Sequence, residues 1–218
     1  MYKHVFLTGP PGIGKTTLIQ KASEVLTSSG ISTEGFFTEE VRQGGRRIGF
    51  DVVTLSGKRG TLSRIGSESR TDRREYKVGQ YVVDLVSFEH LALPVLTTVS
   101  KETSTQKTVC VIDEIGKMEL FSESFIHVVR KTLECAGAVI LGTIPVPKGK
   151  PLPLVEEIRR RPDVKVFTAS VKSWRRPERS LVGERLSCKG PALADITSWG
   201  AEICYRELTV CPSHTPLN

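Results

Sequence analysis

The sequence predicts an α/β fold, with a mostly parallel sheet that is flanked by helices and carries an inserted antiparallel β-hairpin. Apolar runs typical of buried strands alternate with segments of helical periodicity, which favours parallel strands with right-handed crossovers. The run at 108–112, Thr-Val-Cys-Val-Ile, is uninterrupted, as in a central strand covered on both faces. Two β-rich segments around a Gly-Gly turn lie inside this alternation, so we expect the hairpin to belong to the same domain.

The first elements are a strand at 4–8, a glycine-rich loop, and a helix at 17–26 that Gly30 is expected to cap. Strands at 35–42 and 47–55 form the hairpin, joined by a tight turn at 43–46. A turn at 56–60, a polar loop at 64–75 and a strand at 78–84 follow. The next helix, at 88–93, is expected to be interrupted by Pro94.

The last regular elements are strands at 108–112, 138–144 and 164–167, with helices at 121–133 and 152–161 between them. They complete one domain, which we place at residues 1–168. Residues 169–218 show weak periodicity and several turn residues, and we expect them to form a loosely organised C-terminal extension.

The loop after the first strand matches the phosphate-binding pattern G-x-x-x-x-G-K-[ST], in the strand–loop–helix order that the motif requires. Its glycines let the backbone curl around a phosphate, and the loop amides and helix N-terminus attract the anion. Lys15 is expected to reach the β- and γ-phosphates, and Thr16 to bind Mg²⁺. The predicted nucleotide-binding residues here are Gly9, Pro10, Pro11, Gly12, Ile13, Gly14, Lys15 and Thr16.

Two carboxylates, Asp113 and Glu114, follow the strand at 108–112. A carboxylate at the C-terminal end of a neighbouring parallel strand lies near the phosphate site. Asp113 is therefore predicted to be the acidic residue that helps to bind Mg²⁺, usually through water. Glu114 is predicted to be the catalytic base that orients and activates water, with Lys15 as the second catalytic residue. Water as the acceptor favours hydrolysis over transfer to a second substrate.

Alternatives to a hydrolase remain open at this stage. The string Asp113-Glu114-Ile115-Gly116 also matches D-x-x-G of GTPase switches, but the Asn-Lys-x-Asp element that reads guanine does not occur in the chain. A small-molecule or nucleoside kinase would need the same loop. A regulatory module that binds nucleotide as a switch for a partner is the alternative that is not an enzyme.

For several other polar residues the sequence indicates a functional role less strongly. Thr143 ends a strand and could contact the γ-phosphate or water, whereas Lys117 and Glu119 are expected in a solvated loop. In phosphoryl transfer an arginine side chain often stabilises the negative charge that develops in the transition state. The candidates are Arg42, Arg46, Arg47 and residues 159–161, each of which is more simply a surface residue.

The composition indicates which binding partners and which cellular compartment to expect for the protein. The chain has 31 basic and 24 acidic side chains, a net charge of +7, but the basic pairs are scattered and do not interleave with aromatic residues. We therefore expect nucleoside triphosphates as partners, no specific nucleic-acid binding, no membrane and a monomer. Five cysteines without a C-x-x-C pair indicate reduced thiols, in the cytoplasm or the nucleus. A cleavable leader would remove part of the loop that starts at Gly9, so none is expected.

The chain resembles the small family of P-loop nucleoside-triphosphatases found in mammals and thermophilic prokaryotes, and within it the mammalian branch. The resemblance covers residues 1–168 and rests on the segments at 4–12, 38–42, 47–50, 113–119 and 142–145. It implies slow, Mg²⁺-dependent hydrolysis of ATP, GTP, CTP and UTP to the diphosphate, with broad base selectivity. It also implies a second nucleotide-contacting segment, consisting of Val109, Cys110, Val111, Ile112, Asp113, Glu114, Ile115 and Gly116.

The chain departs from the family pattern after Phe167. The family usually continues through a Thr-x-x-Asn-Arg-like segment into a short helix, but residues 168–174 read Thr-Ala-Ser-Val-Lys-Ser-Trp. This difference affects the contacts expected with the base of the nucleotide, and leaves the expected phosphate chemistry unchanged.

Overall fold

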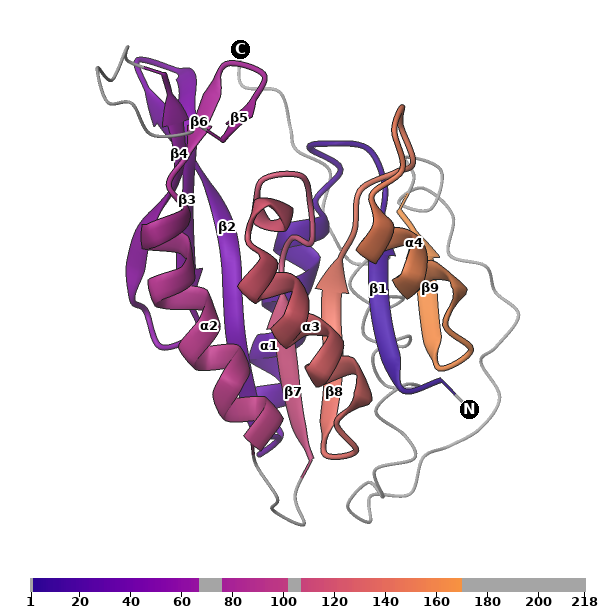
Figure 1. Ribbon diagram of the computed structural model, residues 1–218. Helices are drawn as coiled ribbons and strands as arrows, with labels where there is room; N and C mark the ends of the chain where they lie inside the picture. The colour runs from indigo at the N-terminus through magenta and orange to yellow at the C-terminus, as the bar shows by residue number, and fades with distance from the viewer. Residues whose placement is uncertain (1, 67–75, 102–106, 170–218) are drawn as a thin grey trace, which may run out of the picture.

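The computed structural model describes residues 2–66, 76–101 and 107–169, which form one sheet with its covering helices (Figure 1). Within this part of the chain the sheet has nine strands, in the order β5-β6-β4-β3-β2-β7-β8-β1-β9. Apart from its first residue, the C-terminal extension predicted at 169–218 lies outside the described residues, as do the loop residues 67–75.

One half of the sheet is parallel. It contains β2 (Thr33–Gln43), β7 (Thr108–Ile112), β8 (Ala138–Thr143), β1 (His4–Thr8) and β9 (Val164–Thr168), in that order. The first strand therefore lies between β8 and β9, which come last in the described chain. This half of the fold confirms the predicted parallel sheet.

The other half is antiparallel and extends outward from β2. Strand β3 (Arg46–Thr54) completes the predicted hairpin, and β4 (Arg59–Ile65), β6 (Tyr81–Val83) and β5 (Lys77–Val78) continue it to the edge. The addition is larger than predicted. Strand β4 occupies part of the segment expected to be turn and loop. The single strand expected at 78–84 is two short strands joined by a turn at 79–80.

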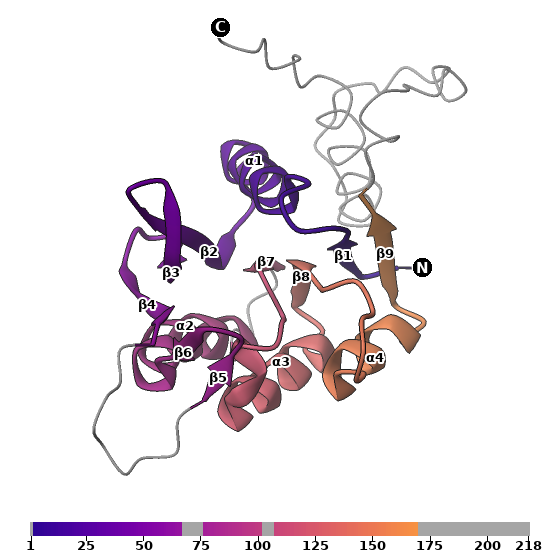
Figure 2. The ribbon, with the colours of Figure 1, turned by 90° about the horizontal axis from the view of Figure 1, so that it is seen from above.

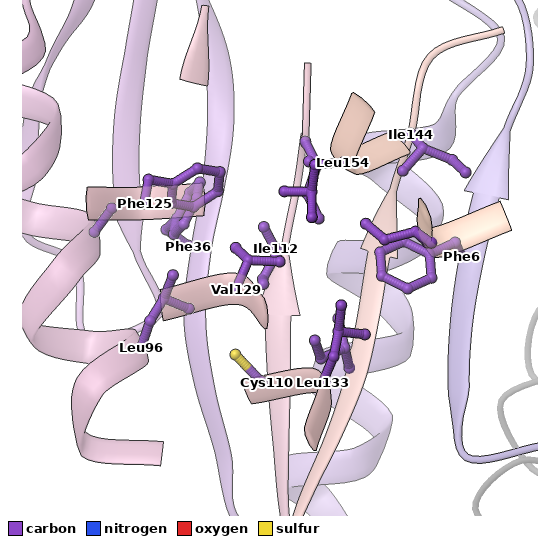
Figure 3. Packing of buried hydrophobic residues seen from close by; sticks show 14 of the residues in the cluster. Phe6, Phe36, Leu96, Cys110, Ile112, Phe125, Val129, Leu133, Ile144 and Leu154 are labelled. Atoms are coloured by element: carbon purple, nitrogen blue, oxygen red, sulfur yellow. The ribbon is translucent and has the colours of Figure 1, made fainter. Parts of the chain in front are cut away.

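Helices cover both faces of the sheet (Figure 2). Helix α1 (Lys15–Ser28) lies on one face, and α2 (Leu85–Lys101), α3 (Glu123–Glu134) and α4 (Pro153–Arg160) lie on the other. Alternate residues of the central strands supply the two cores, because successive side chains in a strand point to opposite faces. In β1, Val5 and Leu7 pack toward α1, whereas Phe6 packs into the larger core under α3 and α4 (Figure 3).

Helix α2 continues through Pro94 instead of stopping there. Its buried residues Phe88, Ala92, Leu96 and Val99 recur on one face, against the sheet. Burying the side chains of Phe88, Leu96 and Val99 contributes about 1.5–3 kcal/mol each, which together outweighs a cost of about 3 kcal/mol for an internal proline. The prediction of an interrupted helix was wrong for this reason.

A buried histidine joins β1 to the neighbouring elements. His4 Nδ1 accepts a hydrogen bond from the Ile140 amide at 3.0 Å, and so Nε2 carries the proton and donates to the Leu133 carbonyl at 3.1 Å. Burial lowers the pKa of His4 to about 4. The side chain is therefore neutral in the folded protein near pH 7.

Helix length and hydropathy argue against a membrane span in the described part of the chain. None of the helices there is both long and apolar enough to cross a bilayer.

Candidate functional site

The glycine loop connects the end of β1 to the start of α1, as the motif requires. Gly14 caps α1 with φ 93°, and Gly12 has φ 72°, values in the left-handed region that glycine adopts without a steric penalty. The helix begins at Lys15, so its free amides and positive end face the loop. The local backbone thus has the geometry expected of an anion-binding turn.

Lys15 lies over the loop that precedes it. Its Nζ donates to the carbonyl oxygens of Gly9 at 3.1 Å and Pro10 at 3.3 Å. Gly9 is itself confined by the end of β9, since a Cβ atom there would lie 2.7 Å from the Ala169 carbonyl oxygen. These contacts hold the ammonium group at the mouth of the loop.

Asp113 follows β7 and is almost completely buried. Thr143, at the end of β8, donates a hydrogen bond of 2.6 Å from Oγ1 to Asp113 Oδ1. Burial raises the pKa of Asp113, while hydrogen bonding by Thr143 and Thr16 and the charge of Lys15 act in the opposite direction. Thr143, for which the sequence left the role open, orients this carboxylate.

The other oxygen of Asp113 tests whether the residues fit a divalent cation. Oδ2 is buried and has no hydrogen-bond partner among the described residues. An unpartnered buried carboxylate oxygen costs free energy unless a ligand satisfies it, and oxygen ligands are those that Mg²⁺ prefers. With the Thr16 hydroxyl close enough to influence this carboxylate, the donor set fits Mg²⁺.

Glu114 follows through a cis peptide bond and reaches the same region. Burial raises the pKa of its carboxyl group, Lys15 lowers it, and the charge of Asp113 raises it. A base with a raised pKa accepts a proton more readily from water at neutral pH. The carboxylate is therefore suited to the role that the sequence predicts for it.

A cavity of about 480 Å³ brings Lys15 and Glu114 together at the carboxyl ends of the parallel strands. Gly9, Lys15, Glu114 and Glu119 line it on the side of the loop. Phe50, Leu62 and Val78 of the antiparallel half line it as well, and so does the segment 145–152 after β8. Ligand sites in open α/β sheets occur at this edge.

The structure brings some of the predicted residues to the cavity and leaves others away from its surface. Lining residues are Gly9, Pro10, Pro11, Lys15, Glu114 and Gly116. The lining does not include Gly12, Ile13, Gly14 and Thr16 of the loop, or Val109, Cys110, Val111, Ile112, Asp113 and Ile115, which are buried in or beside β7. Burial also raises the pKa of the Cys110 thiol, which is consistent with the predicted core position.

Glu119 is where the sequence-based expectation of a solvated loop fails. It begins the short 3₁₀ helix η1 (Glu119–Phe121), is only 4% exposed, and accepts a hydrogen bond of 3.0 Å from the Gly116 amide at Oε2. The backbone turn after Glu114 carries its side chain inward. Only its spacing from Asp113 and Glu114 could have indicated this position.

The segment 145–152 is a second part of the site that was not predicted. Lys148 and Lys150 on it are exposed and line the cavity on either side of Gly149. Its position directly after a parallel strand is the signal that could have identified it, because such loops meet at one edge of the sheet.

Of the candidate arginines, Arg159 contacts Thr8, the residue before the loop. Its Nη2 donates to Thr8 Oγ1 at 3.0 Å and to the Pro145 carbonyl at 2.7 Å. Arg42 and Arg47 pair with Glu40, and Arg161 pairs with Asp163.

Fold and site together define a P-loop protein with a hydrolase-like acid pair, and comparison with known proteins identifies the family. A model of the NTPase family matches residues 4–179, and the chain belongs to this family. It is 70% identical over 170 residues to the human cancer-related nucleoside-triphosphatase, covering 78% of this chain and 90% of that protein. It is 40% identical over 183 residues to the nucleoside-triphosphatase THEP1 of Thermotoga maritima, covering 84% and 93%.

Two solved structures are similar to this one. The solution structure of a human cancer-related nucleoside triphosphatase matches with a TM-score of 0.69 and 69% identity, over 78% of this chain and 90% of that chain. The crystal structure of THEP1 from Aquifex aeolicus matches with a TM-score of 0.63 and 36% identity, over 78% and 91%. Both confirm the predicted fold class and the resemblance.

Proposed function

We propose that the protein hydrolyses nucleoside 5′-triphosphates to the diphosphate and phosphate, slowly, with Mg²⁺ and with broad base selectivity. One observation carries this proposal. A carboxylate suited to act as a base, Glu114, and the phosphate-binding ammonium of Lys15 line the same cavity beside the glycine loop. A triphosphate held by Lys15 would thus have a water-activating group at its γ-phosphate.

Different residues of the site bind the phosphates, bind Mg²⁺ and activate water. The loop amides and Lys15 bind the β- and γ-phosphates, and Thr16 and Asp113 would hold Mg²⁺. Bound Mg²⁺ would supply charge neutralisation to the phosphate oxygens. Glu114 takes a proton from the attacking water as its oxygen bonds to the γ-phosphorus, and the bond from that phosphorus to the bridging oxygen breaks. The electron pair leaves with the diphosphate.

The apolar part of the cavity lining supports broad base selectivity. The side chains of Phe50, Leu62 and Val78 carry no hydrogen-bonding group with which to distinguish one base from another. They offer contact area to any base. A base that packs against these three side chains meets no hydrogen-bonding group there, and the polar lining residues of the same cavity include Thr38, Lys117, Lys148, Lys150 and Glu156. Discrimination by hydrogen bonding, which can reach large ratios, would need contact with that polar part.

The test is steady-state phosphate release from ATP, GTP, CTP and UTP, with and without Mg²⁺, for the wild type and Glu114→Gln. We expect all four to be hydrolysed at rates within about tenfold, since apolar contacts discriminate weakly. Glu114→Gln should keep the nucleotide Kd and lower kcat by roughly 100-fold or more, the usual contribution of a general base. Glu24→Gln, an exposed change on α1, is the matched control. Equal phosphate release by Glu114→Gln and wild type would rule out the assigned base.

The same assay separates the other two function classes. A kinase would transfer labelled phosphate to an acceptor faster than it releases phosphate to water. A regulatory module would show negligible turnover alone and a rise with its partner. Acceptor-independent release by the isolated protein excludes both.

A further inference from the structure

Glu119 is a buried carboxyl group that the proposed mechanism does not use. Two hydrogen bonds tie η1 to Gly116: the Gly116 amide donates to Glu119 Oε2, and the Leu120 amide donates to the Gly116 carbonyl at 3.1 Å. Gly116 is two residues beyond Glu114. The Glu119 side chain thus holds the backbone turn that directly follows Glu114.

The two glutamates also lie close to one another. A Cβ atom on Gly116 would be 2.9 Å from Glu114 Oε1 and 3.1 Å from Glu119 Oε2, so these oxygens are at most about 6 Å apart. Both side chains line the cavity with Lys15. Two negative charges at this separation, largely out of water, repel strongly.

The charge state of Glu119 follows from its surroundings. Burial raises the pKa of Glu119 to about 8, and the charges of Glu114 and Asp113 act in the same direction. The hydrogen bonds from the Glu119 and Gly116 amides lower this pKa and offset only part of the rise. Other ionisable groups lie on the elements around it: Lys15 on α1, Glu89 on α2, Lys117 in its own loop, and Lys148, Lys150 and Glu156 across the cavity. Near pH 7 the side chain is a neutral carboxylic acid.

We propose that neutral Glu119 is a positioning residue for Glu114. Its carbonyl oxygen holds the Gly116 amide, and its lack of charge leaves Glu114 as the single ionised glutamate facing the γ-phosphate. Ionisation of Glu119 places a second negative charge beside both the base and the triphosphate. The inference rests on the proposed hydrolysis and deepens it, because it predicts that hydrolysis slows at alkaline pH as Glu119 ionises.

Three variants test the inference in phosphate-release assays between pH 6 and pH 9.5. Glu119→Gln keeps a neutral side chain with a carbonyl oxygen for Gly116, so it should retain kcat at pH 7 within about twofold. Glu119→Ala removes the contact and should lower kcat about tenfold or more with KM within about threefold, since misplacement of a catalytic group costs rate. Glu123→Ala, an exposed change at the start of α3, should match the wild type.

The pH profile separates positioning from a merely structural role. The wild type should lose roughly tenfold in kcat/KM between pH 7.5 and pH 9.5, and Glu119→Gln should lose much less, because it has no proton to release. A folded Glu119→Ala with wild-type kcat overturns the inference. An unchanged alkaline loss in Glu119→Gln, or a Glu119→Gln protein as slow as Glu119→Ala, overturns it as well.

A readout without nucleotide distinguishes failure of this inference from failure of the proposed function. The amide cross-peak of Gly116 in ¹H–¹⁵N spectra should shift with a midpoint near the Glu119 pKa of about 8 in the wild type. It should not do so in Glu119→Gln. If the wild type released no phosphate, the proposed function would fail. A Gly116 signal that does not titrate overturns the role of Glu119 whether or not hydrolysis occurs.

Discussion

Thr143 and Asp113 join the ends of two neighbouring parallel strands inside the site, through the 2.6 Å hydrogen bond between Thr143 Oγ1 and Asp113 Oδ1. Thr143→Val removes this donor without changing the side-chain shape. A hydrogen bond to a charged group is worth about 1.5–3 kcal/mol, so we expect roughly 10- to 100-fold weaker activation by Mg²⁺. The measurement is phosphate release as a function of Mg²⁺ concentration.

Thr143→Ser is the matched control for this change, because it restores the hydroxyl group. It should require close to the wild-type Mg²⁺ concentration. If Thr143→Val were half-activated at the same Mg²⁺ concentration as the wild type, the orienting role of Thr143 would be wrong.

Lys15→Ala removes the ammonium group that the Gly9 and Pro10 carbonyls hold at the loop. Loss of a charge-assisted contact to phosphate costs about 3 kcal/mol, so the nucleotide Kd should rise by roughly 100-fold. Titration calorimetry with a non-hydrolysable triphosphate measures this change. Lys58→Ala, at an exposed turn, should bind as the wild type does, and tight binding by Lys15→Ala would contradict the assigned contact.

Lys148 and Lys150 are exposed on the segment after β8, where they border the cavity. Exposed charges attract an anion through solvent, and salt screens this attraction over about 10 Å at 0.1 M ionic strength. The double change Lys148→Ala, Lys150→Ala should raise KM a few-fold at low salt and leave kcat unchanged. The KM difference should vanish near 1 M salt, and a difference that persists there would show direct contact with substrate.

His4 makes the stability of the sheet sensitive to acid. Its pKa is about 4 in the folded protein and 6.5 in a free side chain, so the unfolded chain binds a proton that the folded protein excludes. Stability contributed by neutral His4 is present above pH 6.5 and is lost as the pH falls toward 4, by roughly 3 kcal/mol in total. Urea unfolding across this range measures the loss.

His4→Gln removes this titration and should flatten the same part of the stability curve, at a lower stability near pH 7. His127→Gln, an exposed change on α3, should follow the wild-type curve. An equally steep loss in His4→Gln would assign the acid sensitivity to other groups.

The sequence predicts the parallel half of the fold and its glycine loop well, because their signals are local. Each central strand is an apolar run, and the phosphate motif is a continuous string with a fixed geometry. Asp113 could be placed for the same reason, since a strand end determines where the next side chain lies. Its partner Thr143 lies thirty positions away in the sequence, and their hydrogen bond appears only when β7 and β8 pair.

The missed elements depend on pairing that the sequence does not display. Strand β4 contains Arg59 and Arg64, which look solvated until Asp51 of β3 is seen to pair with both. Glu119 looks like a loop carboxylate until Gly116 is seen to donate to it. In each case an ionisable side chain is satisfied by a partner that the composition of its segment does not reveal, and so composition predicts a loop.

The position of β1 has a consequence for the order of assembly. Strand β1 pairs only with β8 and β9 in the described sheet, across 136 to 160 positions of the chain. The hairpin of β2 and β3 closes over a two-residue turn and pairs early, because short loops cost little entropy to close. A nascent chain that ends at Glu134 has a complete glycine motif with no neighbouring strand to fix it. We therefore expect nucleotide affinity to arise only after β8 and β9 have paired with β1, so that triphosphate binding would report a finished domain.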